Sequence, residues 1–224
     1  MDDRIRNLYQ LGLDALETRN ARKAHRIADK LAALHNTAAY EIGARAHWMV
    51  GDHDKAIQLL QVGVSKFPHV AILWYFLGEF LSDMTRYEEA IEAFEKSADG
   101  HGGSRGRADF NIALVHWRKG NYSRALEILN QIDPNMPRHR VLELRGTVLV
   151  DLKRYEEAQG VLEELATSRP KEVTATELSL MLGLMAETEL GLADLEQARY
   201  YAKKCVELDR NQVRGLRVLR ELGD

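Results

Sequence analysis

The sequence predicts an all-α protein in which about six pairs of helices stack into a solenoid and a single helix caps the C-terminal end. Three observations support this fold class. The stretch Trp74–Phe94 contains two short amphipathic runs separated by a break at Ser82–Arg86, so it encodes two helices joined by a turn. All four prolines fall between the resulting units, where they interrupt no helix. A small residue of the second run recurs at intervals of roughly 34 residues, as Ala24, Ala56, Ala90, Ala125, Ala158 and Ala198.

The recurring alanine has a physical reason. The two helices of a pair come closest where they cross, and a larger side chain at that point would push them apart. We expect the units to form a single array over residues 1–224, with the capping helix at 212–222. Counted from the alanine, the units are approximately 5–37, 38–70, 71–104, 105–138, 139–172 and 173–211.

Three places depart from the regular pattern. The first unit has Arg19 where glycine would favour a turn, and such a weak match suits an end repeat. The segment 97–107 contains four glycines, but their spacing fits no nucleotide-binding fingerprint, so we expect a lengthened loop that is a candidate for mobility. In the sixth unit Gly191 precedes Ala198 by seven positions, which predicts a longer turn than in the other units.

The last predicted helix has a narrow apolar stripe. An array must cover its terminal apolar face, so this helix is expected to act as a cap. The arginines between the apolar positions, Arg214, Arg217 and Arg220, are expected to face the solvent, with binding to an acidic partner as the alternative. The stripe consists of Val213, Leu216, Leu219 and Leu222.

Composition and charge narrow the classes of function. Of the 224 residues, 45% are hydrophobic and 29% are charged, which is typical of a folded soluble protein. The 31 basic and 34 acidic residues nearly cancel, so neither nucleic acid nor a membrane surface is expected as a partner. The first residues lack the positive charge and apolar region of a secretory signal, and we therefore expect a cytoplasmic location. The apolar run Val70–Gly78 is too short to span a membrane.

No pattern of residues predicts catalysis, a metal site or a cofactor. Cys205 is the single cysteine, which excludes an intramolecular disulfide and predicts a packed, unreactive thiol. The eight histidines include no pair at metal-ligand spacing with a nearby carboxylate. Acidic pairs such as Glu88 and Glu89 begin predicted second helices, where the helix dipole favours negative charge. An enzyme is therefore the least supported class of function.

The order of residues in Trp74–Phe94 resembles the tetratricopeptide repeat, a 34-residue helix-turn-helix unit. This resemblance implies a right-handed superhelix whose concave groove is lined by the first helix of each unit. It also implies a non-catalytic scaffold that binds a peptide or protein in that groove without a cofactor. The residues that carry the resemblance are Trp74, Leu77, Gly78, Tyr87, Ala90 and Phe94.

Within this family pattern, four positions of each first helix point to the same side and give a stripe of aromatic and charged residues. Aromatic and arginine side chains concentrate binding energy at interfaces, so the stripe is a candidate recognition surface. The alternative for each aromatic residue is packing between adjacent first helices. The candidate partner-binding residues are Tyr9, Glu41, Arg45, Trp48, Tyr75, Glu79, Arg107, Phe110, Asn111, Trp117, Arg140 and Glu143.

The identity of the partner is open. One branch of the family holds the C-terminal carboxylate of chaperones with basic and asparagine side chains, but here only Asn111 and Arg140 match that clamp, and Leu144 stands in place of its last arginine. A chaperone tail is therefore not the predicted ligand. The leading hypothesis is an adaptor for a peptide or protein. The alternatives are a homo-oligomeric structural protein, which associates through the groove or the terminal faces, and an RNA-binding helical repeat.

Overall fold

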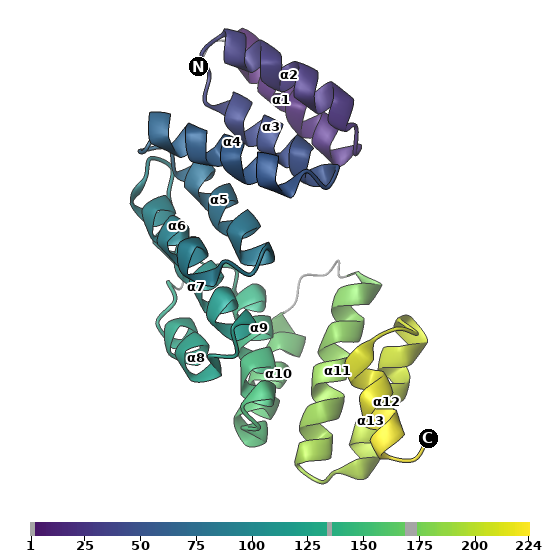
Figure 1. Ribbon diagram of the computed structural model, residues 1–224. Helices are drawn as coiled ribbons and strands as arrows, with labels where there is room; N and C mark the ends of the chain where they lie inside the picture. The colour runs from purple at the N-terminus through teal and green to yellow at the C-terminus, as the bar shows by residue number, and fades with distance from the viewer. Residues whose placement is uncertain (1–2, 134–135, 169–173) are drawn as a thin grey trace. The chain divides into compact units, whose positions relative to one another are not determined.

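A computed structural model describes residues 3–133, 136–168 and 174–224 of the protein, and this part of the chain is α-helical without a β-strand (Figure 1). None of the described helices is both long and apolar enough to cross a membrane. The helices are α1 (Asp3–Glu17), α2 (Ala21–Ala33), α3 (Ala38–Met49), α4 (His53–Lys66), α5 (Ala71–Asp83), α6 (Tyr87–Asp99), α7 (Arg105–Arg118), α8 (Tyr122–Asn130), α9 (Arg138–Asp151), α10 (Tyr155–Ser168), α11 (Ala175–Gly191), α12 (Leu195–Leu208) and α13 (Val213–Glu221).

One helix pair lies in each predicted unit, from α1–α2 to α11–α12, and α13 occupies the predicted capping position. The predicted fold class, an all-α solenoid of helix pairs, is confirmed. Two of the predicted boundary residues, Pro134 and Pro170, lie outside the described part of the chain.

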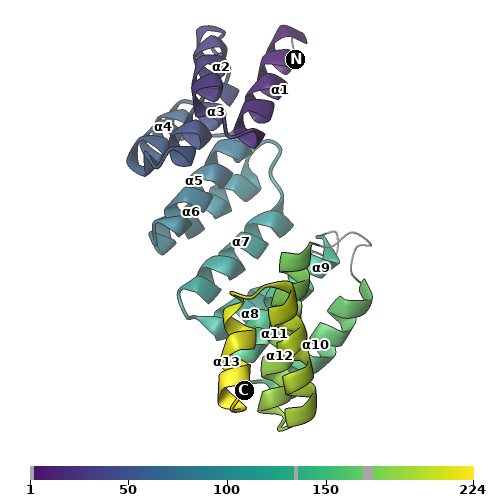
Figure 2. The same ribbon diagram turned by 90° about the vertical axis from the view of Figure 1, so that its right-hand side faces the viewer.

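The chain divides into two compact parts, which we call the N-terminal unit (Met1–Val115) and the C-terminal unit (His116–Asp224). In the N-terminal unit each helix from α1 to α6 packs against the next, and the first helices α1, α3 and α5 also contact one another in turn (Figure 2). In the C-terminal unit the same succession runs from α8 to α13, and α11 also contacts α9 and α13. A single array over the whole chain stays a prediction.

The recurring alanine is a point of close packing in every pair. In the third pair the neighbouring contact is between Gly78 of α5 and Phe94 of α6, where a Cβ atom on the glycine would lie 2.8 Å from the ring. Such distances leave no room for a larger residue, so helix packing explains why the positions are small. The recurring alanines, each with a fully buried side chain, are Ala24, Ala56, Ala90, Ala125, Ala158 and Ala198.

The same type of turn connects the two helices of each of the six pairs. One residue, five positions before the buried alanine, adopts a positive φ. The next N–H then donates to the carbonyl five residues earlier at 2.8–3.0 Å, which is the Schellman ending of a helix. The left-handed residues are Arg19, Gly51, Thr85, Gly120, Lys153 and Ala193.

The turn of the sixth pair is not longer than the others, so that prediction was wrong. Ala193, rather than Gly191, is the left-handed residue, and it stands at the usual distance from Ala198. The additional residues belong to α11, which continues to Gly191. Glycine fits there because the ring of Tyr155 packs against it, and a Cβ atom would lie 2.4 Å from the ring atoms.

The glycine-rich segment between α6 and α7 is tied to the connection between α4 and α5. The His101 N–H donates to the His69 carbonyl at 2.6 Å, and the His101 carbonyl accepts from the Ala71 N–H at 3.3 Å. The Ser97 hydroxyl adds a hydrogen bond to the Ala71 carbonyl at 3.1 Å. These contacts tie the segment to the connection between α4 and α5, and the mobility expected from its glycines stays a prediction.

The capping helix α13 packs on α11 and α12, and Leu219 and Leu222 of the predicted stripe lie on the packed side. Gly215 allows a close approach to α12, since a Cβ atom there would lie 2.8 Å from the Cys205 sulfur. With this face turned inward, Val213 is 73% exposed and Leu216 is 39% exposed, so their predicted burial was wrong. The residues that face α11 and α12 are Gly215, Val218, Leu219 and Leu222.

Candidate functional site

Predicted residues of the N-terminal unit form connected contacts across its first helices. Tyr9 on α1 donates a hydrogen bond to the Glu41 carboxylate on α3, at 3.1 and 3.2 Å from the two oxygens. Arg45, one turn further along α3, donates to the same carboxylate at 3.1 Å. The Arg45 guanidinium lies 4.9 Å from the ring centre of Phe76 on α5. Polar and cation–π contacts therefore link α1, α3 and α5.

The contacts continue from α5 to α7. Tyr75, next to Phe76, donates to the Glu79 carboxylate at 2.7 Å. The Arg107 guanidinium on α7 lies 5.9 Å from the Tyr75 ring centre. Arg107 is exposed, whereas Tyr75 and Glu79 are half-buried. We call the following residues the first-helix row: Tyr9, Glu41, Arg45, Tyr75, Phe76, Glu79 and Arg107.

Burial dominates the electrostatics at the α1 end of the first-helix row. Desolvation raises the pKa of Glu41, although hydrogen bonds and charge from Tyr9 and Arg45 act in the opposite direction. Burial, together with the adjacent Glu41 carboxylate, raises the pKa of Tyr9 to about 12. This end is thus a hydrogen-bonded support, while the Arg107 end is accessible to solvent.

Three other predicted residues make packing contacts. Trp48 stacks on Phe80 with ring centres 4.1 Å apart and planes 5° from parallel. Phe110 is buried on α7. Asn111 is also buried, and its side-chain amide donates to the Arg107 carbonyl at 2.9 Å. These contacts match the packing alternative better than a role at an open surface.

The remaining predicted residues belong to the C-terminal unit. Trp117, at the end of α7, donates its indole N–H to the Asp151 carboxylate of α9 at 2.6 Å. Arg140 is exposed and Glu143 is half-buried on α9. The Glu143 backbone carbonyl accepts a hydrogen bond from the Thr147 hydroxyl at 2.8 Å. Trp117 and Asp151 lead into a group of residues that the sequence analysis did not predict.

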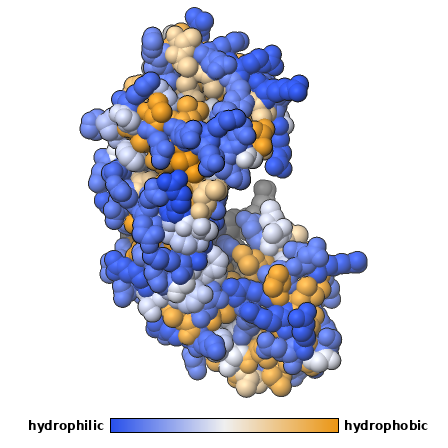
Figure 3. Space-filling view, viewed as in Figure 1, coloured by the Kyte–Doolittle hydropathy of each residue, from blue (hydrophilic) through white to orange (hydrophobic). Residues whose placement is uncertain are grey.

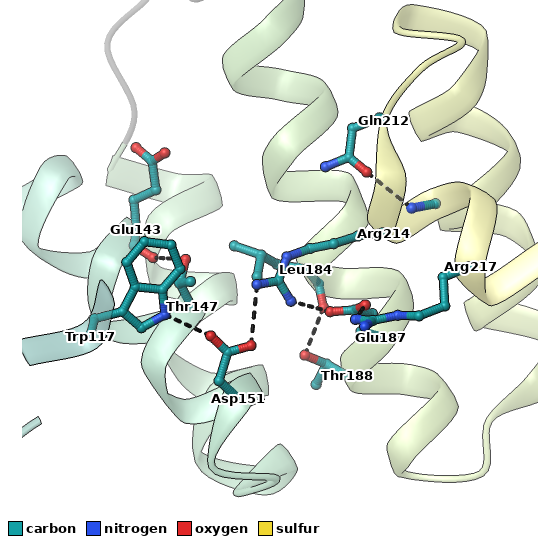
Figure 4. A network of polar contacts seen from close by, with 11 residues as sticks. Trp117, Glu143, Thr147, Asp151, Leu184, Glu187, Thr188, Gln212, Arg214 and Arg217 are labelled. Carbon is teal, nitrogen blue, oxygen red and sulfur yellow. Dashed lines mark hydrogen bonds and ion pairs between the residues drawn. The ribbon is translucent and has the colours of Figure 1, made fainter. Parts of the chain in front are cut away.

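This group is a polar network that joins α7, α9, α11 and α13 (Figure 4). Asp151 on α9 accepts from Arg214 on α13 at 3.2 Å. Arg214 also pairs with Glu187 on α11, and Glu187 pairs with Arg217. Glu187 is only 7% exposed, so its charge requires such partners. We call Trp117, Asp151, Glu187, Arg214 and Arg217 the α13 ion network.

The expectation that Arg214 and Arg217 face only solvent was wrong. Because α13 buries Gly215 and Val218, its helical periodicity directs both arginines toward α11. One signal could have found the network: Glu187 lies inside the apolar run MLGLMAETELG, where a charged residue needs a compensating partner.

A cleft of about 530 Å³ lies beside the α13 ion network. The ends of α9 and α11, the start of α10 and one side of α13 form its walls. Its volume falls within the ordinary range for pockets that hold small molecules or a few side chains. Its charged lining comprises Asp151, Lys153, Glu187, Arg217 and Glu221, and its other lining residues are Val150, Tyr155, Leu190, Gly191 and Val218.

The described residues contain no group of three or more histidine, cysteine or acidic side chains that could hold a metal ion. Cys205 is buried between α11 and α13, and its thiol donates to the Ser179 carbonyl at 3.2 Å. Burial raises the pKa of this thiol, which keeps it neutral. Its environment is that of a packed residue rather than a reactive one.

Comparison with protein families gives matches along much of the chain. The family model described as tetratricopeptide repeat matches residues 9–71 and 43–99. The model described as anaphase-promoting complex, cyclosome, subunit 3 matches residues 107–165. No curated protein sequence matches the chain significantly.

Several solved structures share the fold. PilF of Pseudomonas aeruginosa has a TM-score of 0.78 and 18% identity, over 98% of both chains. PilW, described as a widely conserved type IV pilus biogenesis factor, has a TM-score of 0.79 and 17% identity, over 98% of this chain and 100% of its own. YrrB, described as a TPR protein with an unusual peptide-binding site, has a TM-score of 0.57 and 15% identity, over 93% of this chain and 97% of its own.

At these identities the structural likeness concerns the fold alone. The family models, the six helix pairs and the buried alanine of each pair agree with one another. The chain is therefore a tetratricopeptide-repeat protein.

Proposed function

We propose that this chain is a non-catalytic scaffold or adaptor that binds a peptide or protein partner along the first-helix row. Tetratricopeptide repeats are in general a protein-interaction fold rather than a catalytic one. YrrB, a structural neighbour, is described as having a peptide-binding site. The surface used and a cytoplasmic location are parts of the proposal, which names no individual partner.

The observation that carries the proposal is the exposed Arg107 beside the half-buried Tyr75 and Glu79. Arginine and tyrosine are among the residue types that most often dominate binding energy at interfaces. Tyr75 is already held by its hydrogen bond to Glu79, so it loses little conformational freedom when a partner binds. A flat or extended segment laid across α5 and α7 would meet both side chains together.

The experiment is a pull-down from native lysate, followed by mass spectrometry, with three forms of the full chain. The test variant combines Tyr75→Ala with Arg107→Ala. The control combines Glu92→Ala with Lys96→Ala, an exposed ion pair on the second helix α6. We expect the control to capture the same partner as the unmodified chain and the test variant to lose it, while both variants keep their helical circular dichroism. Capture of that partner by the test variant at full strength would contradict the proposal.

Self-association is a second candidate, supported by the exposed apolar pair on α13. Val213 and Leu216 lie three residues apart on one side of this helix. In Figure 3, hydrophobic residues interrupt the hydrophilic surface in the region of α11, α12 and α13. Light scattering over a concentration series tests this candidate. A mass that rises with concentration, and falls back in the variant Val213→Ser with Leu216→Ser, would support it; a strict monomer would remove it.

RNA binding has weaker support, because the net charge of -3 offers little attraction to phosphate. A mobility-shift assay that showed tight, salt-sensitive binding would overturn this judgement.

A further inference from the structure

In the cleft beside the α13 ion network, the Glu187 carboxylate pairs with two arginines that differ in solvent exposure. Arg214 is 16% exposed and bridges Glu187 and Asp151, so it is part of the framework. Arg217 is 56% exposed and reaches Glu187 from the solvent side of α13. Arg217 can therefore leave the cleft without uncovering a buried guanidinium, whereas Arg214 cannot.

The charge of the lining favours a positively charged guest. Asp151, Glu187 and Glu221 supply three carboxylates, against Lys153 and Arg217. When Arg217 swings into solvent, the three carboxylates face Lys153 and the Arg214 guanidinium, which still pairs with Asp151 and Glu187, so one negative charge remains in excess. An anionic guest would have to approach all three carboxylates, which repel it.

The rest of the cleft suits the stem of a long side chain. Val150, Leu190 and Val218 provide apolar surface, and the Tyr155 ring stands next to them, packed on Gly191. Arginine has an aliphatic stem that packs on such surface and a planar head that bonds a carboxylate through two N–H groups. The distribution of apolar wall and buried acid therefore matches arginine better than a compact cation.

We infer that this cleft binds an arginine side chain of a partner peptide, which replaces Arg217 at the Glu187 carboxylate. Arg217 then acts as an internal competitor that occupies the site when no partner is present. The inference uses none of the first-helix row, so it stands or falls separately from the proposed function.

The test measures binding of the blocked peptide acetyl-Ala-Leu-Arg-Leu-Ala-amide to the full chain by isothermal titration calorimetry. A citrulline peptide keeps the shape of arginine without its charge, and we expect it to bind about five- to tenfold more weakly. A peptide with glutamate in place of arginine is expected not to bind. Equal affinity for the arginine and citrulline peptides, or stronger binding of the glutamate peptide, would refute the inference.

The role of Arg217 as a competitor gives a sharper test. Removing an internal competitor raises the apparent affinity for the guest by the factor by which the competitor had lowered it. For a competing arginine that is itself more than half exposed, we expect this factor to be about two- to fivefold. Arg217→Ala should therefore tighten binding of the arginine peptide by that factor. The matched control Arg220→Ala, an exposed arginine on the same helix outside the cleft lining, should leave it unchanged. Weaker binding by Arg217→Ala would show that this arginine attracts the guest, and the inference would be wrong.

Two acidic variants complete the test. Glu187→Gln should abolish binding of the arginine peptide. Because Glu187 is buried and this variant can fail to fold, Glu221→Gln serves as a second variant at an exposed position of the same lining. It should weaken the arginine peptide at least twofold and leave the citrulline peptide unaffected. Equal effects on the two peptides would contradict a charge-based site.

Discussion

Replacing Arg214 with methionine should destabilise the C-terminal unit by about 2–3 kcal/mol. Methionine keeps most of the length of the side chain and removes the guanidinium. Asp151 and Glu187 then lose the group that bridges them. The expected effect is thus an electrostatic loss rather than a cavity.

The magnitude follows from what each carboxylate retains. Removing one partner of a buried ion pair costs about 3–5 kcal/mol when the other charge is left alone. Here Asp151 keeps the indole N–H of Trp117 at 2.6 Å, and Glu187 keeps Arg217. A hydrogen bond to a charged group is worth about 1.5–3 kcal/mol, so these remaining partners bring the expected loss below that range, to about 2–3 kcal/mol.

Urea denaturation of the full chain measures this loss. Trp117 is a local reporter because it bonds Asp151 directly, so the experiment uses a background in which Trp48 and Trp74 are phenylalanine. Hydrogen exchange followed by mass spectrometry should show that amides of α13 lose protection in Arg214→Met before those of α1–α6 do.

Two further variants decide whether the reasoning holds. Arg220→Met, at an exposed position of the same helix, should change the free energy of unfolding by less than about 0.5 kcal/mol. Adding Glu187→Leu to Arg214→Met should recover part of the loss, since it removes the uncompensated buried carboxylate. If Arg214→Met were no more destabilising than Arg220→Met, the network would not contribute to stability.

Three other predictions concern the N-terminal unit and the helix surface. Gly78→Ala should destabilise the protein by about 1–3 kcal/mol because its Cβ would meet the Phe94 ring. Gly160→Ala, with open space around it, should stabilise the protein by about 0.5–1 kcal/mol. Thermal and urea denaturation compare the two variants, and a change in stability of the same sign in both would contradict the packing argument. Burial raises the pKa of Glu41, so the native state takes up a proton at a higher pH than the unfolded chain does. The free energy of unfolding should therefore rise, relative to that of Glu41→Gln, as the pH falls from neutral toward 4.5. A difference in unfolding free energy between the two proteins that does not change with pH would contradict this. In an absorbance titration one tyrosine should ionise near pH 12, and this late step should vanish in Tyr9→Phe.

The sequence predicted the helix pairs because their determinants are local and repeated. A small residue where two helices cross, and a turn a fixed distance before it, recur in every pair and can be counted along the chain. The sixth turn was misplaced because a glycine was taken as its marker. Gly191 is instead required by the ring of Tyr155, which is 36 positions away and cannot be seen in a local pattern.

The candidate site was predictable only in part. Helical periodicity selected every residue of the first-helix row except Phe76, which was missed and which contacts Arg45, and the structure links Tyr9, Glu41 and Arg45 by direct contacts. Periodicity does not indicate how deeply a residue is buried, so Phe110 and Trp48 could not be separated from Arg107. The α13 ion network escaped prediction because the orientation of the last helix depends on Gly215, whose small size matters only through its neighbour on α12.

The left-handed residue in each turn has a consequence for engineering. Only two of the six are glycine, yet all six adopt the same conformation, so the flanking helices impose it on arginine, threonine, lysine and alanine as well. Thr85 is the least suited, because its branched side chain crowds the backbone in this region. Replacing Arg19, Thr85, Lys153 or Ala193 with glycine would therefore relieve backbone strain in one turn at a time. Such substitutions could raise the thermal stability of the protein without altering the first-helix row.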